Sequence, residues 1–161
     1  MSEGIYRLTE VRPVDGVPGR PRPADAGDRR LLVDWIRAFT AEANPEAPGL
    51  DDQEWVDRRL RGMSGTLYVW DHGGPVSMAG HGSATPNGAR IGPVYTPPDR
   101  RRRGYASALV AGVSDIVLAS GKRFCFLFTD LSNPTSNKIY QDVGYEFVCE
   151  AASVAFEEAS G

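Results

Sequence analysis

The sequence predicts a single α/β domain, built on a mixed, mostly antiparallel sheet of about six or seven strands with flanking helices. The chain has 161 residues, of which 41% are hydrophobic and 24% charged, as is usual for one globular domain. Apolar residues recur at helical spacing in the first third and at strand spacing after Thr66. Later, strand-like and helical segments alternate, which is typical of an α/β fold.

The first residues are rich in proline, with Pro13, Pro18, Pro21 and Pro23. Because proline cannot donate to a strand ladder, we expect any strand in residues 1–27 to lie at a sheet edge. Residues 1–16 are predicted to form an extended N-terminal arm, and residues 17–161 to form the domain.

Two amphipathic helices follow. The first, RRLLVDWIRAFTAEA, is expected to be capped by Asp28 and broken by NPEAPG at residues 44–49. The second, DDQEWVDRRLRGM, starts at Asp51 and should end near Gly62.

Three strands form a predicted meander: TLYVWD, PVSMAGHGSAT and ARIGPVYT, with Asn87-Gly88 as a hairpin signal. A helix is predicted over residues 104–120, ended by Gly121. FCFLFT is a continuous apolar run, which predicts a central strand buried on both faces. PTSNKIYQDV should be a short helix closed by Gly144, followed by the strands YEFVCE and SVAFEE.

Composition argues against several classes of function. The net charge of −3 and the pI of about 5.4 disfavour nucleic-acid binding. No apolar run suits a membrane span and MSEGIYRLTE does not resemble a secretion signal, so we expect a cytoplasmic protein. Two histidines and two cysteines offer no metal-ligand spacing, and Cys125 and Cys149 are expected to be buried free thiols.

The stretch TPPDRRRRGYA carries the clearest chemical signal. Prolines stop a strand, four arginines follow, and Gly104 and Ala106 open a helix. The first N–H groups of a helix lack intrahelical partners and carry the positive end of its dipole, so they bind phosphate. Gly104 lets the backbone approach a ligand closely, and the arginines add charge. The stretch therefore predicts a pyrophosphate cradle.

Two motifs resemble the GCN5-related N-acetyltransferase (GNAT) superfamily. Arg101-x-x-Gly104-x-Ala106 is similar to its cofactor loop, Gln/Arg-x-x-Gly-x-Gly/Ala. LFTDLSNPTSNKIYQDVGYEFV is similar to a later motif of the family through Asn133, Asn137, Tyr140 and Gly144-Tyr145. Both motifs stand in the family's order, and the resemblance spans roughly residues 20 to 157.

The resemblance implies a GNAT fold with acetyl-CoA held between two splayed parallel strands, here Ile91–Thr96 and Phe124–Thr129. The Val94 and Thr96 backbones would pair with the pantetheine amides. The implied cofactor-binding residues are Val94, Tyr95, Thr96, Arg101, Arg102, Arg103, Gly104, Tyr105, Ala106, Ser107, Asn133, Asn137 and Tyr140.

The resemblance also implies direct acetyl transfer to a primary amine, with Tyr140 protonating the departing thiolate. A strand N–H, for example that of Val94, would stabilise the oxyanion. The base that takes the amine proton is open among His81, Asp130, Glu42 and a water relay.

A small-molecule or peptide amine is the expected acceptor, its identity is open, and a homodimer is a weaker expectation. A catalytically silent acyl-CoA-binding or regulatory module is the alternative, against which Tyr140 argues.

Overall fold

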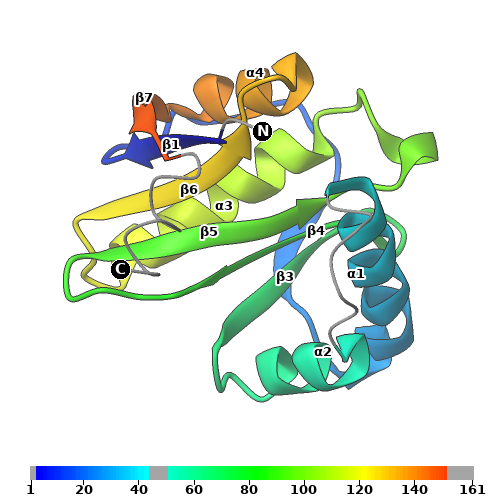
Figure 1. The fold of residues 1–161 in the computed structure, drawn as a ribbon. Helices are drawn as coiled ribbons and strands as arrows, with labels where there is room; N and C mark the ends of the chain where they lie inside the picture. The colour runs from blue at the N-terminus through cyan, green and yellow to red at the C-terminus, as the bar shows by residue number, and fades with distance from the viewer. Residues whose placement is uncertain (1–2, 44–50, 152–161) are drawn as a thin grey trace.

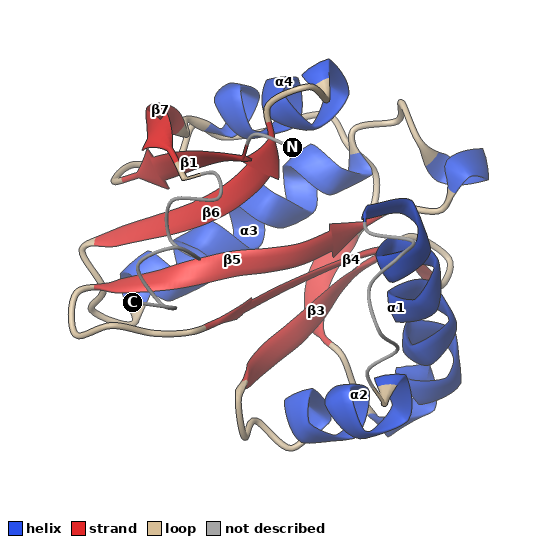
Figure 2. Ribbon diagram, viewed as in Figure 1, coloured by secondary structure: helices blue, strands red, loops and turns tan. Residues whose placement is uncertain are grey.

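The computed structural model describes residues 3–43 and 51–151, which form one seven-stranded sheet with helices on both faces (Figure 1, Figure 2). The strand order is β2-β3-β4-β5-β6-β1-β7. The strands are β1 (Glu3–Leu8), β2 (Arg20–Pro23), β3 (Gly65–Asp71), β4 (Pro75–Gly82), β5 (Gly88–Tyr95), β6 (Phe124–Asp130) and β7 (Glu146–Glu150). The helices are α1 (Arg29–Ala43), α2 (Asp52–Leu60), α3 (Tyr105–Ala119) and α4 (Pro134–Val143), with short 3-10 turns at Ala26–Asp28 and Pro98–Arg100.

The predicted mixed, mostly antiparallel α/β sheet is therefore confirmed. The strands and helices predicted between Arg29 and Glu150 are all present, with bounds close to those expected. The predicted break at residues 44–49 and the predicted strand SVAFEE lie outside the described residues. Within the described ranges, no helix is long and apolar enough to cross a membrane.

The N-terminal prediction is only partly right. β2 does lie at the sheet edge, paired with β3 alone. Glu3–Leu8, however, is an interior strand between β6 and β7, so the expectation that a strand here lies at a sheet edge is wrong for these residues. The proline argument applies to residues 13–23, whereas β1 contains no proline and buries Tyr6 and Leu8.

Two cores lie on opposite faces of the sheet. The larger packs α3 and α4 against one face and includes Leu109, Val113 and Leu127. The smaller packs α1 and α2 against the other face and includes Leu32, Val56 and Met78. Figure 1 shows α3 running behind β5 and β6, with α1 and α2 to the side of β3 and β4. The front of β5 and β6 carries no described helix.

β6 does not have the two buried faces that its apolar run predicts. Cys125, Leu127 and Thr129 are buried against α3, whereas Phe124, Phe126 and Phe128 are only partly buried. A run of apolar residues has no period, so the sequence could not show which face lacks a helix. Cys125 is buried as predicted, and burial raises its pKa to about 11, but Cys149 is exposed.

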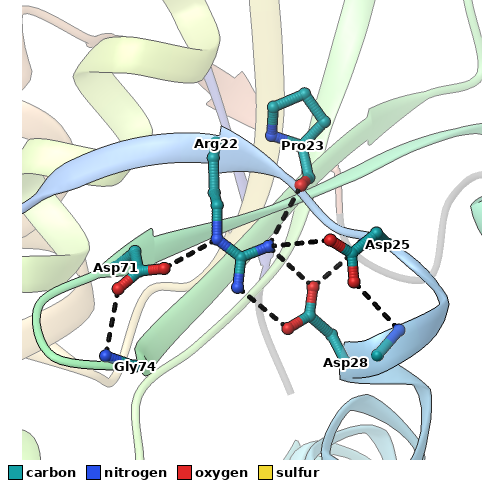
Figure 3. A network of polar contacts seen from close by, with 7 residues as sticks. Arg22, Pro23, Asp25, Asp28, Asp71 and Gly74 are labelled. Atoms are coloured by element: carbon teal, nitrogen blue, oxygen red, sulfur yellow. Dashed lines mark hydrogen bonds and ion pairs between the residues drawn. The ribbon is translucent and has the colours of Figure 1, made fainter.

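Arg22 joins the edge strand to the start of α1 and the end of β3 (Figure 3). Its guanidinium donates to both carboxylate oxygens of Asp28, at 2.9 and 3.0 Å, and to Asp71 at 2.7 Å. Asp28 also accepts from the Asp25 N–H at 2.9 Å, and Asp25 caps the 3-10 turn that precedes α1. The helix cap therefore falls on Asp25, one turn before the predicted Asp28.

The two carboxylates of this network are held charged. Burial of Asp28 raises its pKa, but the hydrogen bonds from Arg22 and the Asp25 N–H outweigh burial and leave the pKa below its usual value. Hydrogen bonds from Arg22 and the Gly74 N–H likewise lower the pKa of Asp71.

Replacing Arg22 with leucine should destabilise the fold by about 1–3 kcal/mol at pH 7, because the buried Asp28 carboxylate loses its charged donor. Depressed carboxylate pKa values stabilise above the unfolded pKa, near 3.9, and this contribution is lost as pH falls through the folded value. Urea unfolding at pH 7 and pH 3 should therefore show a gap between the wild type and Arg22→Leu that narrows in acid. Lys138→Gln, which removes an exposed ion pair with Asp142, is the control and should change little. An equal gap at both pH values would contradict this account of the network.

Candidate active site

Pairing between the parallel strands β5 and β6 stops abruptly. Residues Gly88–Arg90 pair with Phe124–Phe126, and no pair follows. Beyond this point β5 stays with β4, through Ala79↔Val94 and Met78↔Tyr95, while β6 stays with β1. The facing edges of residues 91–95 and 127–130 therefore open into a splay, as Figure 1 shows. The splayed central strands that the sequence analysis expected are confirmed.

The start of α3 lies beside the open end of this splay. Arg102 and Gly104 have positive φ angles of 67° and 84°, and Gly104 is the N-cap without a side-chain cap bond. None of the backbone N–H groups of residues 102–107 donates to a described residue. The first turn of α3 contains no acidic residue. Donors without a described partner at a helix N-terminus, next to exposed arginines, are suited to binding an anion.

Arg101 ties this loop to the rest of the site. Its Nε donates to the Thr96 carbonyl at 2.7 Å, and its Nη2 donates to both carboxylate oxygens of Glu42 at 2.9 Å. The guanidinium also lies over the Tyr95 ring, 5.6 Å from its centroid. In this arrangement Arg101 positions the loop against the end of β5 and α1. Glu42, a candidate base, is held in this ion pair.

Hydrogen bonds with Ser77 of β4 hold the end of β5 in place. Ser77 Oγ contacts Thr96 Oγ1 at 2.8 Å and donates to the Tyr95 carbonyl at 3.1 Å, all in buried surroundings. The Tyr95 ring packs against Trp35, and burial raises the pKa of its hydroxyl. Ser77 was not singled out from the sequence, because a serine in an apolar strand carries no motif. Its contacts with Tyr95 and Thr96 depend on how β4 pairs with β5, which the sequence alone does not show.

Helix α4 brings the later motif to the same side as α3. The Asn133 side chain accepts from the Ser136 N–H at 3.2 Å and so caps α4. Asn137 donates to the Leu131 carbonyl at 3.3 Å, but its buried Oδ1 has no partner among the described residues. A buried acceptor without a partner is costly, so Oδ1 requires a donor from water or a ligand.

Tyr140 packs against the larger core, as Val94 does. Its ring meets Tyr145 edge-on at 6.1 Å, and burial raises the pKa of Tyr140 to about 12. Its hydroxyl makes no hydrogen bond within the described ranges. The phenol is therefore protonated at neutral pH and available as a donor.

The remaining candidate bases differ in their surroundings. His81 lies on β4 opposite Ile91, on the face that α3 covers, with its Nε2 3.4 Å from the Tyr68 hydroxyl. Burial, followed by the nearby Arg59 charge, lowers the pKa of His81. Hydrogen bonds from the Ser132 side chain and N–H lower the pKa of Asp130, whose carboxylate is thus held in a turn. Among the described residues, His81 forms no hydrogen bond with Tyr140.

Comparison with known proteins agrees with this geometry. Residues 29–145 match the profile of the acetyltransferase (GNAT) family. No curated protein matches the sequence.

Solved structures share the fold at low sequence identity. A GCN5-related N-acetyltransferase from Sphaerobacter thermophilus is 21% identical, with a TM-score of 0.66 over 92% of this chain and 49% of its own. AAC(6')-Iy, in complex with the bisubstrate analogue CoA-S-monomethyl-acetylneamine, is 18% identical, with a TM-score of 0.63 over 79% of this chain and 90% of its own. The aminoglycoside acetyltransferase meta-AAC0020, from an uncultured soil metagenomic sample and in complex with sisomicin, is 14% identical, with a TM-score of 0.62 over 78% and 86%.

The chain spans 49% of the length of the Sphaerobacter protein, and 53% and 61% of the length of two further GNAT structures, from Colwellia psychrerythraea and Novosphingobium aromaticivorans. The family profile covers most of the chain, from the start of α1 to the end of α4, and includes the splay, the loop and Tyr140. The chain therefore belongs to the acetyltransferase (GNAT) family, as its two motifs predicted.

Proposed function

We propose that this protein transfers the acetyl group of acetyl-CoA directly to a primary amine. The observation that carries the proposal is the row of unpaired N–H groups at residues 102–107, beside the open splay of β5 and β6. This combination offers an anion site next to unpaired strand edges. A ligand in which a diphosphate is joined to an arm that contains amides would fill the anion site and pair with the strand edges.

The described residues fit acetyl-CoA. The N–H groups of residues 102–107 would hold the diphosphate, with the Arg102 and Arg103 side chains exposed nearby. The unpaired edge of β5 near Val94 and Thr96 would take the amides of the pantetheine arm. Asn137 Oδ1, buried without a partner in the described part of the chain, would accept from an amide N–H of the same arm.

When bound, acetyl-CoA supplies a thioester whose C–S bond breaks as the C–N bond to the amine forms. Tyr140 holds the proton that the departing sulfur needs, because its raised pKa keeps it protonated. His81 is the proposed base for the amine proton; because it lies on the α3 side of the sheet, it would act through water. Its lowered pKa keeps it neutral at pH 7, and it lies opposite Ile91, the first β5 residue beyond the last β5–β6 pair. A strand N–H near Val94 would stabilise the oxyanion.

Gly104→Val should weaken acetyl-CoA binding about tenfold or more, which corresponds to losing one charge-assisted hydrogen bond. A Cβ at this position would lie 3.0 Å from the Val17 side chain, and a φ of 84° strains any branched residue. Calorimetry with acetyl-CoA measures the effect. Gly73→Val is a matched control, since its φ is 68° but a Cβ there meets nothing within 4 Å. Normal affinity in a folded Gly104→Val variant would place the diphosphate elsewhere.

Tyr140→Phe should lower turnover by about 100-fold, as loss of a general acid does, and leave acetyl-CoA affinity nearly unchanged. The hydroxyl supports no described hydrogen bond, so stability should not change. Tyr145→Phe is the control: it removes the 2.8 Å bond to Ser114 and should affect unfolding rather than turnover. Unaltered turnover of Tyr140→Phe at every pH would remove Tyr140 from the mechanism.

The pH profile tests His81. If His81 is the base, kcat/KM stays high as the pH falls to about 6.5 and declines only at lower pH. The reason is that the pKa of His81 lies below 6.5, the ordinary value for histidine. His81→Asn should lose this acidic limb and most of the rate. Tyr68→Phe, which removes the hydroxyl beside Nε2, should shift the limb without abolishing it. An identical limb in His81→Asn would assign the proton to water or another group.

A further inference from the structure

Two arginine–aromatic pairs lie on the side of the sheet that carries α2. The Arg59 guanidinium lies over the Trp55 ring, and the Arg90 guanidinium over the Phe128 ring, each at 4.5 Å from the centroid. We call Trp55, Arg59, Arg90 and Phe128 the arginine patch. Neither arginine belongs to the cofactor loop, and no motif marked them in the sequence.

The two guanidinium groups lie on the same face and close together. Gly82 of β4 pairs directly with Arg90 of β5, so side chains at these positions point to the same face. A Cβ on Gly82 would lie 3.1 Å from Arg59 Nη2, which places Arg59 above that pair. The Arg90 charge contributes to lowering the pKa of Arg59, after burial.

Neither arginine pairs with a carboxylate among the described residues. Arg59 donates to the His81 carbonyl at 3.2 Å, and its buried Nε has no partner in the described part of the chain. By contrast, Arg22, Arg29, Arg37 and Arg101 each meet an acid. Two adjacent like charges, one half-buried with an unsatisfied donor, are relieved by an anion placed between them.

The patch lies at the apex of the splay. Arg90 pairs with Phe126 in the last β5–β6 pair, and Phe128 is two residues further along β6. The opposite face at this point is covered by α3, whose N-terminus faces the proposed cofactor site. A thioester held in the splay would therefore be approached by the amine from the side of the patch.

We infer that the arginine patch binds an anionic group of the amine acceptor, a carboxylate or a phosphate, and so selects amines that carry a negative charge. This inference rests on the proposed acetyl transfer. Along β5, the splayed stretch from Gly92 to Val94 is two to four residues from Arg90, or about 7–13 Å. The acceptor should therefore separate its amine from its anionic group by that distance. Polycationic acceptors such as the sisomicin bound to meta-AAC0020 would be repelled by the patch.

A pair of matched probes tests the inference. 6-Aminohexanoate and 6-aminohexanamide have the same length and differ in charge, and 5-aminopentyl phosphate tests the second anion. Thiol release with acetyl-CoA should favour the two anionic probes over the amide by about 10- to 100-fold in kcat/KM. Arg90→Gln should abolish that preference while leaving the rate with the amide unchanged. Arg59→Gln should also abolish it, and is judged by the ratio of acid to amide turnover because Arg59 contacts the His81 carbonyl. Arg90→Lys should restore part of the preference, because it keeps the charge but not the planar fork.

Arg58→Gln is the matched control, since Arg58 is the exposed neighbour of Arg59 on α2 and should leave the preference intact. In the presence of CoA, the thermal shift caused by each anionic probe measures binding of the probe independently of turnover. Arg90 is exposed, so its substitution should not unfold the protein. Equal use of acid and amide, better use of sisomicin, or a preference that survives both Gln variants would overturn the inference and leave acetyl transfer standing. The inference would also be overturned if neither anionic probe showed binding that depends on Arg59 or Arg90. Failure of the wild type to bind acetyl-CoA would instead remove the proposed function, on which the inference rests.

Discussion

The end of pairing between β5 and β6 is the constraint on which the rest of the site depends. Beyond Arg90 and Phe126 two neighbouring parallel strands expose backbone edges that a closed sheet would satisfy. The chain tolerates this because each strand keeps a partner on its other side, β4 for β5 and β1 for β6. Pro93, which has no N–H, removes one donor from the open stretch. The opening is thus built into the strands and does not depend on a mobile loop.

Charge is distributed around the opening in a way that the net charge of −3 hides. The start of α3 presents unpaired N–H groups and exposed arginines on one side, and the arginine patch lies at the apex on the other face. Arg101, in the loop before α3, forms an ion pair with Glu42 and so holds this loop against α1. A mildly acidic protein can therefore offer two separate places for anions, because local geometry decides the field that a ligand meets.

Local signals in the sequence predicted most of the elements and the cofactor loop. Turn residues, helical spacing and the Arg101–Ala106 motif all act within a few residues, so they can be read from one sequence. Contacts between distant residues could not be predicted in this way. The Arg101–Glu42 ion pair, the Ser77–Thr96 bond and the Arg59–Arg90 juxtaposition each depend on how strands pair and how helices dock. The apolar run of β6 likewise predicted a strand, but only the packing of α3 shows which of its faces is closed.

The position of β1 has a consequence for how the chain is made. Residues 3–8 are synthesised before every other described strand, yet their partners are β6 and β7, so that Glu3 pairs with Asp130 and Gly4 with Glu150. A nascent chain must carry this strand, with its apolar Tyr6 and Leu8, without both partners until residues 124–150 have been synthesised. Long-range pairing of this kind slows folding and leaves apolar surface open to aggregation in the meantime. The sheet can therefore be completed only after β7 has left the ribosome, when the first described strand is inserted between the last two.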